Sequence, residues 1–215
     1  LSAYINHSIR NDHESVWIAQ AEGRAKDGRD RTDPAILKMF HMSRKDQPFA
    51  EVIGQLHVIP VSISYEYDPC DQAKARELSI RASTGSYEKA QGEDDASIGL
   101  GITGYKGRVH LHFGDEMDGE IEDARQLATA IDQVILTHYR LFPVHYLAYA
   151  QWADQDAEIQ VPSMVELFSA DELRRAEGEW QRRLDRCPQE YRASLIMQYA
   201  NPVRSHYRIK AGLPL

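Results

Sequence analysis

A short apolar run that leads straight into a basic, glycine-containing loop constrains this 215-residue chain more than any other feature. Residues 16–19 are Val-Trp-Ile-Ala, and the arginine-rich loop at 22–31 follows at once. Glycine permits tight turns and close approach to a ligand, and guanidinium groups offer planar sets of donors that match phosphate oxygens. Asp33 and Pro34 then stand where a helix N-cap and a first helical residue belong. The pattern predicts a strand at 15–20, a phosphate-binding loop and a helix at 34–43.

Three blocks of the sequence resemble the glycerolipid acyltransferases, the family that acylates glycerol 3-phosphate or lysophosphatidic acid. Residues 22–28 resemble the family's Glu-Gly-x-Arg block, although the family normally has an extra residue between Gly23 and Arg24. Residues 58–63 resemble its later apolar-Pro-apolar strand, and residues 106–114 resemble the strand beyond it. The order and the rough spacing match, and the resemblance extends from Ser15 to about Gly114.

The resemblance implies roles for the residues of the loop. Arg24 would contact the phosphate of the acceptor, Glu22 would position the acceptor or brace the loop, and Gly23 would give the ligand room. Lys26 is a candidate second cation for the same phosphate. The family also implies an acyl-CoA or acyl-carrier-protein donor, a glycerol phosphate or lysophospholipid acceptor, and no metal or organic cofactor.

Acyl transfer to a hydroxyl needs a base for the hydroxyl proton and a group that orients this base. In the family these roles belong to a His-x4-Asp motif, and the chain contains this pattern at three places: His7 with Asp12, His41 with Asp46, and His110 with Asp115. His7 and Asp12 alone precede the loop, as the family order requires, but few residues separate them from Glu22. They are therefore weak candidates, and we expect the catalytic pair upstream of Leu1, in a longer polypeptide.

Other motifs have ordinary structural explanations. Residues 99–104 spell G-x-G-x-x-G, but an expected acidic loop precedes them and a strand follows, so a turn is favoured over a dinucleotide site. His110 and His112 share a strand face without a third ligand, which favours a polar strand surface over a metal site. An aromatic cluster is favoured as core, with an acyl groove or a membrane contact as alternatives. It comprises Tyr139, Phe142, Tyr146, Tyr149 and Trp152.

Composition limits the function classes. Hydrophobic residues make up 42% and charged residues 27% of the chain, and no apolar run approaches the roughly 20 residues that span a bilayer. The net charge of −8 disfavours general binding to nucleic acid. Two distant cysteines, Cys70 and Cys187, are typical of reduced thiols in a cytoplasmic protein. A lipid substrate would then be met peripherally, at the cytoplasmic face of the membrane.

The expected fold is α/β, with a mainly parallel central sheet flanked by helices and an all-helical C-terminal extension. Residues 1–140 would form the C-terminal part of an acyltransferase-like domain, with a polar loop at 82–97, and residues 141–215 the helical extension. The predicted function is an O-acyltransferase that moves an acyl group from a thioester donor to glycerol 3-phosphate or a lysophospholipid. The alternative is a noncatalytic phospholipid-binding or regulatory module that retains the phosphate loop.

Overall fold

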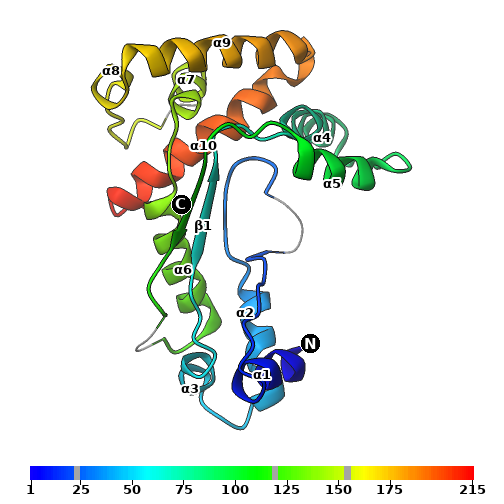
Figure 1. Cartoon of the computed structure of the whole chain (residues 1–215), viewed down its shortest axis with the longest axis vertical. Coiled ribbons are helices and arrows are strands. Elements are labelled where there is room, and N and C mark those ends of the chain that lie inside the picture. The colour runs from blue at the N-terminus through cyan, green and yellow to red at the C-terminus, as the bar shows by residue number, and fades with distance from the viewer. Residues whose placement is uncertain (22–24, 118–120, 153–155) are drawn as a thin grey trace. The chain divides into compact units, whose positions relative to one another are not determined.

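The computed structural model describes residues 1–21, 25–117, 121–152 and 156–215. In these residues the protein is mainly helical, with ten α-helices, two short 3-10 helices and one two-stranded antiparallel sheet (Figure 1). The chain divides into two compact units. Unit 1 contains the described residues of Leu1–Arg24, Asp30–Ser62 and Leu111–His138, and unit 2 contains those of Ala25–Arg29, Ile63–His110 and Tyr139–Leu215.

Unit 1 is a small helical cluster in which α2 packs against α1, α3 and α6. Its helices are α1 (Ser2–Arg10), α2 (Pro34–His41), the 3-10 helix η1 (Met42–Arg44), α3 (Phe49–Gly54) and α6 (Ala124–His138). The four α-helices contribute apolar side chains to one buried core, whereas η1 does not. The core includes Ile5, Leu37, Phe40, Ile53, Leu127 and Ile131.

The start of α2 is the best-defined local feature of unit 1, and it confirms the helix predicted from Asp33 and Pro34. Asp33 Oδ1 accepts a hydrogen bond from Ala35 N at 2.8 Å, and Pro34 occupies the first turn. Just before it, Thr32 donates through its backbone N and its hydroxyl to Asp132 Oδ1 of α6, at 2.8 and 2.6 Å. Burial raises the pKa of Asp132, and the two bonds from Thr32 partly oppose this shift. The entry to α2 is thus tied to α6.

Unit 2 contains the two longest helices of the described residues, α9 and α10, and α10 is central to the unit (Figure 1). Helix α7 packs against α10 and α9, and α4 packs against α10. A second buried core lies here, with Trp180, Tyr199 and Leu195 among its members. The helices are α4 (Asp71–Thr84), α5 (Glu93–Thr103), α7 (Pro143–Gln151), α8 (Met164–Leu167), α9 (Ala170–Arg186), the 3-10 helix η2 (Gln189–Tyr191) and α10 (Arg192–Lys210).

The expected parallel central sheet is wrong for the described residues. The two strands, β1 (Val61–Tyr65) and β2 (Val109–Phe113), pair in antiparallel orientation, as successive bonds from Tyr67 N to Lys106 O and from Gly114 N to Pro60 O show. Both strands lie where the sequence predicted strands, and β1 begins directly after Pro60, which has no N–H to donate. The wrong part of the prediction was the set of neighbouring strands, because the alternation of side chains along a strand does not specify which strand it pairs with.

Three local expectations also need correction. Residues 15–20 form no strand: Val16 and Ile18 pack on the core while Trp17 is exposed, but no neighbouring strand supplies a hydrogen-bonded ladder. The predicted polar loop at 82–97 ends early, because α5 begins at Glu93. Gly99 and Gly101 therefore lie in a helix, not in a turn.

The C-terminal part is helical, as predicted. Ser169 and Glu172 form a capping box at the start of α9, with Ser169 Oγ accepting from Glu172 N at 3.3 Å. The aromatic cluster is core: Phe142, Tyr146 and Tyr149 are buried, and Tyr139 and Trp152 pack against them. No helix in the described residues combines the length and the apolar character needed to cross a bilayer.

The cap of α2 gives a first prediction. Replacing Asp33 with Ala leaves the first-turn N–H of Ala35 without its acceptor and should lower the free energy of unfolding by about 1 kcal/mol. Urea denaturation followed by circular dichroism measures this change. Asp33→Asn keeps an acceptor at the same atom, so it should stay close to the parent protein. Equal losses for both variants would refute the capping role.

Candidate functional site

The structure describes only part of the predicted phosphate loop. Glu22, Gly23 and Arg24 lie outside the described residues, so the structure says nothing of their positions. The adjoining stretch Ala25–Arg29, called here the basic segment, belongs to unit 2 and rests on α4 and α10. Lys74 Nζ donates to Ala25 O at 3.0 Å, and Asn201 Nδ2 donates to Asp27 O at 2.6 Å. The backbone of the basic segment is therefore held at two carbonyls.

Lys26 is the one predicted phosphate-binding residue that the structure describes. Its ammonium group forms an ion pair with the buried carboxylate of Glu77 in α4, and Arg81 binds the same carboxylate at 3.0 Å. Two cations thus share one anion. An incoming phosphate can attract Lys26 without leaving Glu77 unpaired, because Arg81 remains beside it.

Gly28 shows why the basic segment sits where it does. Its φ of +75° lies in the left-handed region, and a Cβ added there would lie 2.1 Å from Gln198 O of α10. This carbonyl would normally accept from the residue four positions later, but that residue is Pro202, which has no N–H. The proline thus leaves a free carbonyl on α10, and only a glycine can approach it this closely.

Arg29 follows directly on this anchored backbone. Its N–H donates to Asp27 Oδ1 at 3.1 Å, while its guanidinium lies 3.9 Å from Asp27 Oδ2, beyond hydrogen-bond distance. The side chain is 39% exposed. A partly exposed guanidinium on a fixed backbone suits recognition of a phosphate.

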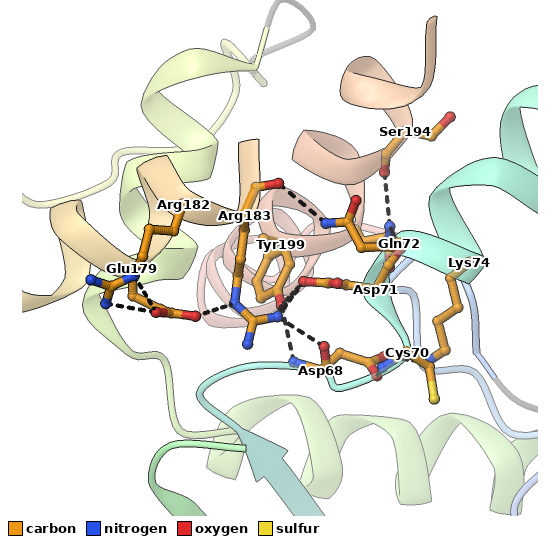
Figure 2. A network of polar contacts seen from close by, with 11 residues as sticks. Asp68, Cys70, Asp71, Gln72, Lys74, Glu179, Arg182, Arg183, Ser194 and Tyr199 are labelled. Atoms are coloured by element: carbon orange, nitrogen blue, oxygen red, sulfur yellow. Dashed lines mark hydrogen bonds and ion pairs between the residues drawn. The ribbon is translucent and has the colours of Figure 1, made fainter. Parts of the chain in front are cut away.

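A buried polar network fixes the helices on which the basic segment rests (Figure 2). Arg183 of α9 forms an ion pair with Asp71 at the start of α4, and Tyr199 of α10 donates to the same carboxylate oxygen at 2.8 Å. Arg183 also donates to Asp68 O at 3.1 Å, and its guanidinium stacks over the ring of Tyr67 at 4.6 Å. Three helices meet at one carboxylate.

Ionisation in this network follows from burial and charge. Burial raises the pKa of Tyr199 well above its usual value, and the neighbouring Asp71 carboxylate adds to the shift. Burial alone would lower the pKa of Arg183, but Tyr199, Asp71 and Glu179 outweigh it and raise the pKa. Arg183 therefore stays charged and Tyr199 stays protonated at neutral pH. Such perturbed groups can mark a reactive site, but these fill their hydrogen bonds among themselves, as a structural network does.

Sequence reasoning missed this network, although one signal for it exists. Ala176, Trp180 and Leu184 define the buried face of α9, and Arg183 lies on the same face. A charged residue at an apolar position of a helix indicates a buried partner of opposite charge. Its partner, Asp71, is 112 residues away in the sequence, so no local pattern identifies it.

A second buried titratable group, His145 of α7, is also structural. Its Nδ1 accepts from Phe142 N at 2.9 Å, which satisfies one of the free donors at the start of the helix. Its ring lies near those of Tyr139 and Tyr199. Burial lowers the pKa of His145 to about 3, so the ring is neutral at physiological pH.

A pocket of about 580 Å³ opens in unit 2 beside α7. Its walls are mostly aromatic and aliphatic and include Tyr146, Tyr149, Ile159, Val161 and Met164. One acidic group, Asp156, also lines it; burial would raise the pKa of Asp156, but hydrogen bonds from Arg208 and Arg204 lower it to about 2. With this carboxylate already bound, the pocket offers mainly apolar contacts. Its size is ordinary for small-molecule sites.

None of the histidine candidates lines the described pocket. His7 Nε2 and Asp12 Oδ1 are 3.5 Å apart, and both side chains are at least half exposed. His41 Nε2 lies 2.7 Å from Gln47 O, so Asp46 does not orient it through that nitrogen. His112 stacks on His138 of α6 with ring centroids 3.8 Å apart. Within the described ranges, no group of three or more His, Cys, Asp or Glu side chains is arranged to hold a metal ion.

Comparison of the chain with protein-family models, with curated proteins and with solved structures found no match.

Gly28 provides the second prediction. Gly28→Ala forces a left-handed backbone and a clash with Gln198 O, so it should lower the free energy of unfolding by more than about 1 kcal/mol. It should also speed trypsin cleavage after Lys26 and Arg29, because the basic segment leaves its seat. Gly178→Ala in α9 is the matched control, since no atom lies within 4 Å of its added methyl. It should be neutral or stabilising, and equal losses for the two variants would contradict the close approach at Gly28.

The buried ion pair provides the third prediction. Asp71→Ala leaves the Arg183 guanidinium charged and unpaired in the core, so chemical denaturation should show a loss of about 3–5 kcal/mol. The double variant Asp71→Ala/Arg183→Leu should lose less than Asp71→Ala alone. Asp171→Ala breaks an exposed pair with Arg174 and should cost less than about 1 kcal/mol. If Asp71→Ala resembles Asp171→Ala, the network does not fix unit 2.

Proposed function

We propose that the chain is part of an O-acyltransferase that moves an acyl group from an acyl-CoA or acyl-carrier-protein thioester to a hydroxyl of glycerol 3-phosphate or a lysophospholipid. In this proposal the chain supplies the acceptor-binding side of the site. Arg24 and Lys26 hold the acceptor's phosphate, with Glu22 and Gly23 shaping the loop. The reaction is direct attack of the hydroxyl on the thioester carbonyl, with a histidine as base.

One observation carries the proposal: cations stand on a backbone fixed in place immediately after the Glu-Gly-Arg sequence. Lys74 and Asn201 hold the carbonyls of the basic segment, and Gly28 packs on α10. Binding a phosphate by flexible side chains on a flexible loop costs entropy, and a fixed backbone reduces this cost. In the absence of the acceptor, Lys26 forms an ion pair with Glu77.

Two further features support the proposal. The second and third resembling blocks lie side by side, because Pro60 O accepts from Gly114 N at 2.9 Å and Val58 O accepts from Met117 N at 2.7 Å. They are thus parts of one local structure. The pocket beside α7 has apolar walls that would accommodate the hydrocarbon chain of an acyl group. The acyltransferase proposal is therefore supported by these local features and not by the overall architecture.

We propose that the membrane is met peripherally, at its cytoplasmic face. A lysophospholipid acceptor lies in a bilayer, and peripheral contact would let the chain reach it from the surface. The second candidate function is a noncatalytic phospholipid-binding or regulatory module that uses the same loop. His7 and Asp12 are at least half exposed, and this favours the second candidate if the full polypeptide supplies no other base.

The test measures acyl transfer by the intact polypeptide, with glycerol 3-phosphate and lysophosphatidic acid compared as acceptors. Arg24→Ala should raise KM for the phosphorylated acceptor at least tenfold, because a charge-assisted hydrogen bond of about 1.5–3 kcal/mol is lost, and should leave KM for the donor nearly unchanged. Lys26→Gln should act in the same direction. Arg174→Ala, at an exposed site of α9, is the control.

Three results separate the candidates. Equal effects of Arg24→Ala on the two KM values remove Arg24 from the phosphate site. Binding of glycerol 3-phosphate that Arg24→Ala weakens, without transfer of acyl groups, supports the noncatalytic module. Absence of both binding and transfer overturns the two candidates together.

A further inference from the structure

The far half of α5 is an uncharged apolar surface. Residues 96–105, called here the α5 tip, contain no charged side chain. Four of their large side chains face water: Ile98 is 52% exposed, Leu100 45%, Ile102 74% and Tyr105 65%. Single exposed apolar residues are common, but neighbouring ones mark a surface that another phase or molecule covers.

The α5 tip cannot be explained as a helix stabilised by its own core packing. No residue of α5 is buried. Gly99 and Gly101 lower its intrinsic helix propensity, since each costs up to about 1 kcal/mol relative to alanine. Most helices of globular proteins are stabilised by an apolar face packed on other elements. In α5 none of the apolar side chains is buried, so they remain available for contact with another molecule.

The α5 tip is nevertheless fixed at its base within unit 2. Cys70 Sγ donates to Ser97 O at 3.4 Å, and the rings of Tyr105 and Tyr67 stack at 5.7 Å. Gly104 lies so close to Pro69 that an added Cβ would be 2.5 Å from the proline Cβ. The exposed side chains therefore stand on a defined support.

The backbone at the end of α5 satisfies its own carbonyls. Such groups usually lack partners at a helix C-terminus. Thr103 Oγ1 donates to Gly99 O at 2.9 Å and Gly104 N donates to Leu100 O at 2.8 Å, while Lys106 Nζ donates to Ile102 O at 3.0 Å and to Gly104 O at 3.1 Å. Internal satisfaction of backbone groups is what a low-dielectric environment requires.

We propose that the α5 tip is a docking surface that inserts into the headgroup region of a lipid bilayer, with uncharged or zwitterionic lipids as the preferred surface. Charge distribution supports this occupant: the acidic residues Glu93, Asp94 and Asp95 lie at the opposite end of α5 and stay in water, while Lys106 marks the edge of the apolar segment. The net charge of −8 disfavours an anionic surface. The inference rests on the proposed function, because a lysophospholipid acceptor is reached at a bilayer.

The experiment is co-sedimentation of the chain with sucrose-loaded phosphatidylcholine vesicles. Ile98→Gln/Ile102→Gln should weaken partitioning at least tenfold, because it removes the apolar area that enters the lipid. The matched control is Val165→Gln/Leu167→Gln in α8, whose parent side chains are 75% and 42% exposed. It should bind as the parent does. A parent that does not sediment with vesicles, or two double variants that sediment equally, overturns the proposal.

A second readout follows the α5 tip directly. Cys70 and Cys187 are buried, so Ile102→Cys offers the accessible thiol for an environment-sensitive fluorophore. Its emission should shift to the blue when phosphatidylcholine vesicles are added, whereas a label on Val165→Cys should not shift. Lipid-independent self-association that Ile98→Gln/Ile102→Gln abolishes would overturn the proposal in favour of contact between two copies. Vesicle binding without acyl transfer would support the docking surface while contradicting the enzyme, so the two failures are distinguishable.

Discussion

The ion pair between Arg183 and Asp71 is the interaction on which the arrangement of unit 2 depends. It joins α9 to the start of α4, and Tyr199 adds α10 at the same carboxylate oxygen. Because desolvation of two charges offsets much of their attraction, a pair of this kind contributes more to a unique arrangement of helices than to net stability. With α4 held at its first residue, Lys74 and Glu77 of the same helix are placed to bind the basic segment. The position of the proposed phosphate-binding cations thus follows from a contact that includes none of them.

Helix α10 supplies the other half of this support through an apparent defect in its sequence. Pro202 removes one hydrogen bond from the helix interior, and this normally destabilises a helix. The carbonyl that it leaves free, Gln198 O, receives the close approach of Gly28, while the preceding residue Asn201 binds Asp27 O. The irregularity at Pro202 in α10 therefore accommodates Gly28 of the basic segment. The presence of a glycine at position 28 is explained by this packing and does not require a ligand.

Local signals in the sequence predicted local structure well. The cap at Asp33 and the strand within residues 106–114 depend mainly on neighbouring residues, and both are present in the structure. Pairing could not be predicted in the same way. Residues 15–20 show the inward and outward alternation of a strand without a ladder, and Arg183 finds its partner 112 residues away. The α/β assignment was wrong because it assumed that the apolar runs pair as neighbouring strands of one sheet. The sequence of an apolar run does not specify which strand it pairs with.

The helical architecture changes the basis of the functional argument without removing it. Function belongs to sites, and the proposed acceptor site requires a set of cations at fixed positions. Ala25–Arg29 meets this requirement through contacts with two helices, and Glu77 keeps Lys26 near its place. In the predicted α/β fold, the end of a strand would have held the loop in place. In the structure, side chains of α4 and α10 hold the basic segment instead. If the proposed function is right, a substitution in the Arg183–Asp71–Tyr199 network should affect acceptor binding as well as stability, because the same helices support both.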